Sequence, residues 1–256
     1  MMTGLNEAKA FWSKRIADAK ARISGDELKE RVSDYPAPLE FLARLQSKQD
    51  KDGFAVIGEI GKPDIAISLF DPTELARAYE LGGAAGLAII SDCATSERDL
   101  WQLQLARGAT RLPVLCGDLM LDPYQIYQAR SWGADCICLN VDAVADPVAQ
   151  LLEREARDLA MEIIVEISNQ QGLARAVQLG ARLLCINQVD LAVSERLTKD
   201  APSRFFVVSR GANYNHMGCL RLAQSDIGAI VMNESRALPR DAAIAMERVI
   251  QGHLAG

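Results

Sequence analysis

Short runs of apolar residues recur along the chain from Phe54 onward, with segments of helical spacing between them. Eight such runs are present, at residues 54–60, 86–91, 112–116, 135–140, 162–167, 182–187, 204–209 and 228–233. Unbroken apolar runs, as opposed to alternating ones, are typical of parallel strands that helices cover. The pattern therefore predicts an α/β fold in which eight β/α units close into a (β/α)₈ TIM barrel.

Helix boundaries between the runs are marked by turn-forming residues. Asp71-Pro72 predicts a helix start, and Gly82, Gly133 and Gly180 predict helix ends.

Ahead of the first run, the spacing predicts two helices, over 5–24 and 37–48, with Pro36 and Pro38 at the entry to the second. We expect a single domain over 1–256, in which an N-terminal helical extension, 1–53, precedes the barrel, 54–256. The extension is expected to cap the bottom of the barrel or to lie over its mouth.

Charge and apolar composition exclude some classes of binding partner. The chain has 256 residues and a formal net charge of −6. It has no block of Lys and Arg, which argues against nucleic acid or an anionic membrane as the partner. No apolar run approaches the roughly 18 residues that span a bilayer, and the first 20 residues predict an amphipathic helix, so we expect a cytoplasmic protein.

Cysteine spacing and known motifs give no sign of a cofactor. Four of the six cysteines, Cys116, Cys136, Cys138 and Cys185, lie on predicted strands, and we expect buried, reduced thiols there. No Ser-His-Asp set, HExxH, GxGxxG or GxxxxGK[ST] pattern occurs. No metal or cofactor is therefore expected.

Polar residues follow nearly every predicted strand. Because the chemistry of such barrels lies where strands end, these residues predict a ligand site lined by converging side chains. They are Glu59, Asp92, Asp118, Asn140, Glu166, Asn187, Arg210 and the stretch Asn233-Glu234-Ser235.

The centre of the chain resembles a known family. Asp122-Pro123-Tyr124-Gln125-Ile126-Tyr127, followed by Ala129-Arg130 and Gly133-Ala134-Asp135, is similar to the centre of indole-3-glycerol phosphate synthase. That family consists of (β/α)₈-barrel carbon–carbon lyases (carboxy-lyases) of tryptophan synthesis, so the resemblance implies this fold and a phosphorylated sugar as ligand.

The resemblance implies three catalytic residues. Glu59 matches an active-site glutamate, Glu166 matches the general base, and Asn187 matches an asparagine that contacts sugar hydroxyls. Each has a structural alternative: Glu59 would form an ion pair with Lys62 or Arg210, and Glu166 and Asn187 would only satisfy the ends of their own strands.

Six further residues are candidates for binding the substrate and its phosphate. Barrels of this type hold phosphate with loops 7 and 8, and a guanidinium can bind an anion through two hydrogen bonds. Arg210 has the alternative of a surface residue in a loop. The candidates are Lys62, Arg210, Gly211, Asn233, Glu234 and Ser235.

Two departures from the family bear on catalysis. Gly117 stands where the family has a lysine that acts as general acid, and Gly61 stands where it has a second, substrate-contacting lysine. Loss of a positioned acid is expected to cost on the order of 10²–10⁴ in rate. Val189 also replaces a polar residue that contacts the anthranilate carboxylate, and Asn233 replaces a glycine near the phosphate.

Three hypotheses follow. The first is a divergent enzyme that binds a phosphorylated sugar or related anion, with the ring-closing decarboxylation lost or altered. The second is a non-catalytic relative that binds a metabolite or a partner enzyme of the tryptophan pathway. The third is a genuine synthase that uses substitute residues such as Lys62.

Overall fold

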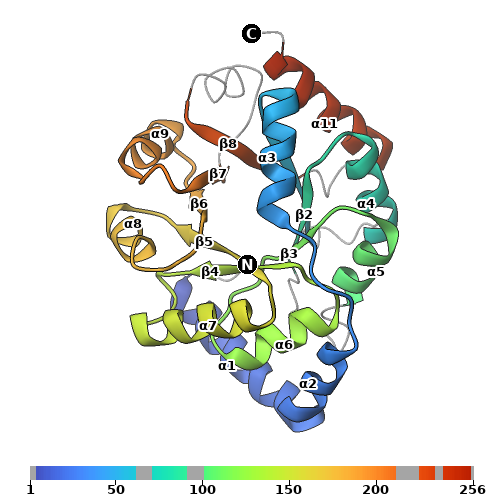
Figure 1. The fold of residues 1–256 in the computed structure, drawn as a ribbon, viewed down its shortest axis with the longest axis vertical. Coiled ribbons are helices and arrows are strands. Elements are labelled where there is room, and N and C mark those ends of the chain that lie inside the picture. Colours follow the sequence, from blue (N-terminus) through green and yellow to red (C-terminus); the bar gives the residue numbers. More distant parts are fainter. Residues whose placement is uncertain (1–3, 62–70, 91–100, 212–224, 234–238, 255–256) are drawn as a thin grey trace.

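Eight parallel strands form a closed barrel in sequential order, as the apolar runs predict (Figure 1). The structure is a computed structural model and describes residues 4–61, 71–90, 101–211, 225–233 and 239–254. Each strand pairs with its two neighbours, and β8 closes the ring on β1. The strands are β1 (Ala55–Gly61), β2 (Gly86–Ile90), β3 (Val114–Cys116), β4 (Cys136–Asn140), β5 (Glu162–Ile167), β6 (Leu183–Asn187), β7 (Phe206–Arg210) and β8 (Ile227–Asn233).

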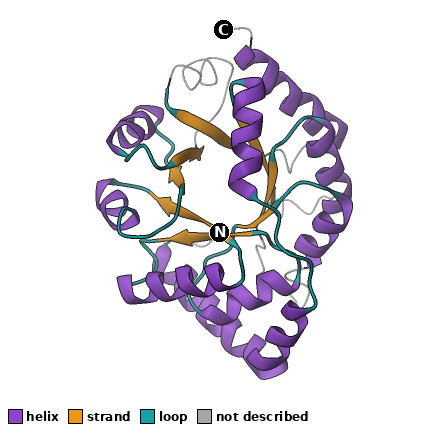
Figure 2. Ribbon diagram, in the orientation of Figure 1, coloured by secondary structure: helices purple, strands orange, loops and turns teal. Residues whose placement is uncertain are grey.

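Helices alternate with the strands and lie outside the ring (Figure 2). Asp71 caps the first of them through a 2.8 Å bond to the N–H of Thr73, and Gly82 ends it, as predicted. These outer helices are α4 (Pro72–Leu81), α5 (Trp101–Ala109), α6 (Pro123–Ser131), α7 (Asp146–Asp158), α8 (Gln170–Ala176), α9 (Leu191–Asp200) and α11 (Pro239–Leu254). No helix of the described residues has both the length and the apolar character needed to cross a bilayer.

The predicted helix end at Gly180 is wrong, because α8 already ends at Ala176. Gly180 instead allows a close approach: a Cβ there would lie 2.6 Å from Nη2 of Arg157. Its N–H donates to Oε1 of Glu153 at 2.6 Å. The glycine therefore serves packing between α7 and β6 and does not end a helix.

The N-terminal extension contains three helices where two were predicted. They are α1 (Leu5–Arg22), α2 (Gly25–Ser33) and α3 (Phe41–Asp52). The predicted helix 5–24 ends early because Ser24 starts α2, accepting a hydrogen bond from the N–H of Glu27 at 3.1 Å. The predicted helix 37–48 starts late, since residues 36–40 form a non-helical segment that includes Pro36 and Pro38.

The extension splits between the bottom and the side of the barrel. Phe41, Leu42 and Leu45 of α3 belong to the apolar cluster inside the ring, which they close at the ends where strands begin. The first turn of α3 is held there because the N–H of Leu42 donates to Oε2 of Glu162, at the start of β5 (2.8 Å). By contrast, α1 and α2 lie against α6 on the outside (Figure 1).

Side chains alternate between the inside of the ring and the surrounding helices. Inside lie small and branched residues such as Ala55, Ala88 and Val208, whereas Val56, Leu87 and Val207 face the helices. Continuing this alternation to the strand ends decides which residues meet at the mouth of the barrel.

Candidate functional site

The last inward-facing positions of the strands form the mouth. By the alternation along each strand, they are occupied by a ring of polar, apolar and glycine residues. Going round the barrel from β1, this ring contains Glu59 and Gly61, then Ile90, Gly117, Asn140, Glu166, Asn187, Arg210 and Asn233.

Arg210 joins two carboxylates from opposite sides of the mouth. Its Nε and Nη2 lie 2.9 and 2.7 Å from Oε2 of Glu59. Its Nη1 donates to Oε2 of Glu166 at 3.0 Å. The two glutamates are buried, with 8% and 6% of their surfaces exposed. We call these three residues the Arg210 cluster.

Two amides complete the hydrogen bonding of this cluster. Nδ2 of Asn233 donates to Oε1 of Glu59 at 2.7 Å, and Nδ2 of Asn140 donates to Oε1 of Glu166 at 2.9 Å. Each oxygen of both carboxylates therefore accepts at least one hydrogen bond. The ion-pair alternative for Glu59 is present in the structure with Arg210 as the partner, and Arg210 lies in β7, not on a surface loop.

Electrostatics keep the guanidinium charged. Burial by itself lowers the pKa of Arg210, but the carboxylates of Glu59 and Glu166 outweigh it and raise the pKa above its ordinary value. Two carboxylates and one guanidinium leave the cluster with a formal charge of −1. Arg210 can thus offset negative charge at the mouth, but it does not release a proton near neutral pH.

Buried thiols lie directly beneath the cluster. Sγ of Cys138 is 3.9 Å from Oε2 of Glu166. Burial is the main cause that raises the pKa of Cys138 and of Cys185, and the nearby Glu166 carboxylate adds to it. As expected, the four cysteines of the described strands, including Cys116 and Cys136, are buried, and none of them forms a disulfide.

Ile90 occupies the space beside two glycines of the mouth, Gly61 and Gly117. A Cβ on Gly117 would lie 2.3 Å from Cδ1 of Ile90, and one on Gly61 would lie 3.7 Å from Cβ of Ile90. This wall of the mouth is therefore apolar. The residue types at 61 and 117 were evident from the sequence, but the role of Ile90 was missed, although its place on an inward strand position was a usable signal.

Asn187 and Gly211 lie together at the ends of β6 and β7. Gly211 has a φ of +91°, which favours glycine, and a Cβ there would be 2.9 Å from Oδ1 of Asn187. Asn187 is exposed, as is Val189, whose exposed fraction is 75%. Glycine at 211 therefore leaves room for the amide of Asn187 at the rim.

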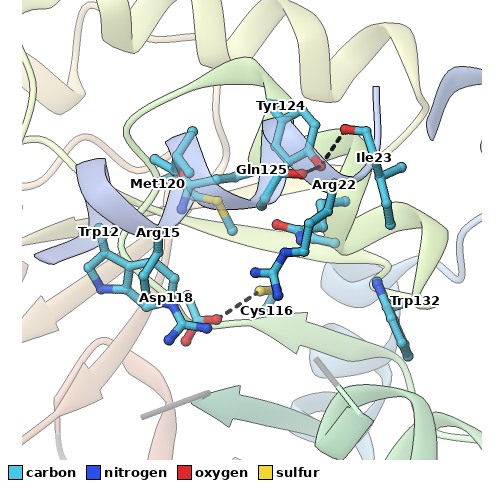
Figure 3. A pocket seen from close by; sticks show the side chains of 14 residues that line it. Trp12, Arg15, Arg22, Ile23, Cys116, Asp118, Met120, Tyr124, Gln125 and Trp132 are labelled. Atoms are coloured by element: carbon cyan, nitrogen blue, oxygen red, sulfur yellow. Dashed lines mark hydrogen bonds between the residues drawn. The ribbon is translucent and has the colours of Figure 1, made fainter. Parts of the chain in front are cut away.

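Other candidates lie outside the described residues or away from the mouth. Four of them lie outside the described residues: Lys62, Asp92, Glu234 and Ser235. Asp118 was expected in the polar ring, but it lies two residues past the end of β3, on the outer side of the barrel, and lines a cavity beneath α1 (Figure 3). The alternation explains the error, since Gly117 takes the inward position and Asp118 the outward one.

A metal site finds no support within the described part of the chain, where no group of three His, Cys, Asp or Glu residues is arranged to hold an ion. The chemistry of the mouth rests on carboxylates, amides and one guanidinium. Such groups bind hydroxyls and position polar ligands.

The fold is shared with several solved barrels of low sequence identity. Tryptophan synthase subunit alpha from Legionella pneumophila aligns with a TM-score of 0.64 at 15% identity, covering 83% of this chain and 97% of that one. Thiamine phosphate pyrophosphorylase from Pyrococcus furiosus aligns with a TM-score of 0.61 at 14% identity, covering 80% and 99%. These similarities concern the fold alone.

Sequence comparison gives the family. The chain is 33% identical over 230 residues to indole-3-glycerol phosphate synthase of Mycolicibacterium vanbaalenii, covering 86% of this chain and 83% of that protein. It is 32% identical over 248 residues to the synthase of Zymomonas mobilis subsp. pomaceae, covering 93% and 94%. The family model described as indole-3-glycerol phosphate synthase matches residues 5–246. This chain therefore belongs to the indole-3-glycerol phosphate synthase family.

Proposed function

We propose that this barrel binds a phosphorylated sugar or related anion at its mouth, and that the ring-closing decarboxylation of its family is lost or altered. The observation that carries the proposal is the Arg210 cluster, in which one guanidinium engages both Glu59 and Glu166. Both carboxylates are therefore engaged by one guanidinium, which makes neither of them a free base.

The residue types at positions 61 and 117 support an altered reaction. Ring closure needs a proton for the ketone and then for the departing hydroxyl, whereas Gly61 and Gly117 carry no ionisable group. Arg210 holds its proton too tightly to replace them, because Glu59 and Glu166 raise its pKa. Without a positioned acid, the rate falls by on the order of 10²–10⁴.

A sugar phosphate fits the distribution of polar groups. Hydroxyl groups both donate and accept, so they can bond to the carboxylates of Glu59 and Glu166 and to the amides of Asn140, Asn187 and Asn233. The cluster itself has a formal charge of −1 and repels a phosphate. We therefore expect the phosphate at the loops after β7 and β8, near Gly211, where barrels of this type bind it.

The proposal is tested with the substrate of the family. The protein is mixed with 1-(2-carboxyphenylamino)-1-deoxyribulose 5-phosphate, and indole fluorescence is followed. We expect turnover at least on the order of 10²-fold below ordinary enzyme rates, together with a thermal shift by ribulose 5-phosphate that ribulose does not give. Ordinary turnover would instead establish a genuine synthase with substitute residues. No shift with either sugar would favour a non-catalytic role.

Placing a lysine at position 117 gives a sharper test with a matched control. Gly117→Lys alone drives its Cβ against Ile90, whereas Gly117→Lys with Ile90→Ala removes the obstructing methyl groups. If only the acid is missing, the double variant gains more indole formation than the single one. Equal activity of the two variants would contradict the role we give to Ile90.

We further propose a cytoplasmic location and a partner enzyme from the tryptophan pathway. Both proposals derive from the family. A pull-down with the purified pathway enzymes tests the second: retention of one of them on the tagged barrel is expected, and absence of retention at micromolar concentration would argue against it.

A further inference from the structure

The ion pairs of the mouth engage only part of the Arg210 guanidinium. An arginine side chain carries five N–H groups in one plane, one on Nε and two on each Nη atom. Oε2 of Glu59 lies 2.9 and 2.7 Å from Nε and Nη2, and Oε2 of Glu166 lies 3.0 Å from Nη1. These contacts account for three of the five. Nη1 and Nη2 therefore each keep one N–H group without a partner among the residues that the structure describes.

The planarity of the guanidinium gives the direction of one of these N–H groups. The two N–H groups of Nη2 point along different edges of the plane, one beside Nε and the other beside Nη1. Because Glu59 takes the edge beside Nε, the remaining N–H of Nη2 points along the edge that Nη2 shares with Nη1. A ligand oxygen at this edge meets at least one charge-assisted donor.

The open end of the barrel gives access to the guanidinium. Arg210 is the last residue of β7, and 24% of its side chain is exposed, against 11% and 8% for the side chains of Glu59 and Glu166. Beneath it, the ring is filled by the buried side chains of Val208 and Cys185. The exposed part of Arg210 therefore faces the mouth, where a ligand enters.

The charge of the mouth limits the kind of oxygen that this edge accepts. A guanidinium only donates hydrogen bonds, so its partner must be an acceptor. The two carboxylates and one guanidinium of the Arg210 cluster already sum to −1, and a further anionic group at this partly buried position is repelled. An uncharged carbonyl oxygen accepts the hydrogen bond and adds no charge. It also presents a more polar bond to the cation than a hydroxyl oxygen does.

We propose that Arg210 determines the specificity of the mouth by receiving an uncharged carbonyl oxygen of the ligand. The inference deepens the function proposed above and rests on it. The ligand is then an open-chain sugar phosphate, whose carbonyl group lies at Arg210 and whose phosphate lies at the loops after β7 and β8. This role differs from that of a phosphate-binding residue, for which the sequence also made Arg210 a candidate.

Three ligands with the same phosphate and the same length of carbon chain test the proposal. Ribulose 5-phosphate carries a ketone, ribitol 5-phosphate carries only hydroxyls, and 5-phosphoribonate carries a carboxylate. Calorimetric titration gives their affinities. We expect ribulose 5-phosphate to bind at least about tenfold more tightly than either of the others, the effect of one hydrogen bond to a charged group.

The outcomes separate this inference from the function on which it rests. Equal affinity for 5-phosphoribonate would make Arg210 an anion site, and equal affinity for ribitol 5-phosphate would mean that the mouth does not select a carbonyl group. Either result overturns the inference and leaves binding of a sugar phosphate in place. Binding of none of the three would contradict the proposed function itself, and this inference with it.

The carbonyl group also reports its own surroundings. Ribulose 5-phosphate labelled with carbon-13 at its carbonyl carbon is observed by NMR, free and bound to the unmodified protein. A cationic donor draws electron density from the carbonyl carbon toward the oxygen. We therefore expect the resonance of the bound ligand to move downfield. A bound ligand whose resonance stays in place would refute the contact with Arg210.

Arg210→Lys tests the residue itself. The ammonium keeps a positive charge near Glu59 and Glu166, but it lacks the planar edge that a guanidinium offers. We expect about tenfold weaker binding of ribulose 5-phosphate, a smaller downfield shift and loss of the preference over ribitol 5-phosphate. Arg77→Lys, at an exposed position of α4 where Arg77 pairs with Glu74, is the matched control and leaves all three unchanged.

A preference for ribulose 5-phosphate that survives in Arg210→Lys would show that another residue receives the carbonyl group. The ligand series and the NMR shift use the unmodified protein, so they decide the proposal even where Arg210→Lys does not fold.

Discussion

Arg210 is the residue on which the charge balance of the mouth depends. Removing one member of a buried ion pair leaves the other charge without compensation, which costs more than the pair contributes when intact. Here two carboxylates depend on one guanidinium, and their other hydrogen bonds come from the uncharged amides of Asn140 and Asn233. The ion pairs of the Arg210 cluster therefore support the fold.

Arg210→Met is expected to lower the free energy of unfolding by about 3 kcal/mol, because Glu59 and Glu166 are left as unpaired buried carboxylates. Urea unfolding at neutral pH measures the loss.

The triple variant Arg210→Met, Glu59→Gln, Glu166→Gln is the control. It should regain much of the lost stability, because no uncompensated charge remains. An Arg210→Met protein as stable as the parent at neutral pH would show that the Arg210 cluster contributes nothing to stability.

At the scale of elements, the link between the extension and the barrel depends on polar groups at the starts of strands. The segment before α3 is held by Asp135, next to β4, whose Oδ1 accepts from the N–H of Leu39 at 2.9 Å. The first turn of α3 has no cap from its own N-cap residue, Glu40, and receives one from Glu162 of β5. The carboxylate of Glu162, distant in sequence, thus accepts a hydrogen bond that a local N-cap side chain would otherwise accept.

Glu162→Ala is expected to destabilise the protein by about 1 kcal/mol, the usual cost of a lost helix cap. Glu162→Gln keeps an acceptor oxygen and should cost less. Thermal unfolding compares the two. A larger loss in the Gln variant would mean that the charge, not the acceptor, supports α3.

The titration of Glu162 gives this contact a pH dependence. Burial raises the pKa of the Glu162 carboxyl, although the N–H groups of Leu42 and Phe41 lower it in part. The folded state therefore binds the proton more tightly than the unfolded chain, whose glutamates titrate at about 4.3. The stabilisation that comes from this tighter proton binding is present below a pH of about 4.3, and it is lost as pH rises through the pKa of Glu162 in the folded protein. In Glu162→Gln this part of the pH dependence should disappear.

For the whole molecule, the periodicity of apolar residues predicted the strands better than it predicted the side-chain contacts at their ends. The eight apolar runs predicted all eight strands, because continuous burial on both faces leaves an unmistakable pattern. The sequence also indicated Glu59, Glu166 and Arg210, and it offered their pairing as one alternative. It did not predict which face Asp118 takes or that Ile90 stands beside Gly117, since both depend on the phase of side-chain alternation at short strand ends. The short helix α2 was missed because Leu28 and Val32 are its only large apolar residues.

The closed barrel leads to a prediction about the reactivity of the cysteine thiols. Cys136, Cys138 and Cys185 point into the interior from β4 and β6, and burial raises their pKa values, so they should resist alkylation at about pH 8. Reaching them requires the ring to open. Cys116 is also buried, but it faces outward and lines the cavity beneath α1. Detachment of α1 would expose it without opening the barrel.

Iodoacetamide labelling across a guanidinium series, resolved by mass spectrometry of peptides, separates these events. We expect Cys116 to react at lower denaturant than the three interior thiols, whose labelling should coincide with the loss of circular dichroism. Coincident labelling of all four would mean that α1 leaves only when the barrel unfolds. Early labelling of Cys138 alone would contradict a cooperatively closed ring, because it requires β4 to separate from its neighbours while the other strands stay paired.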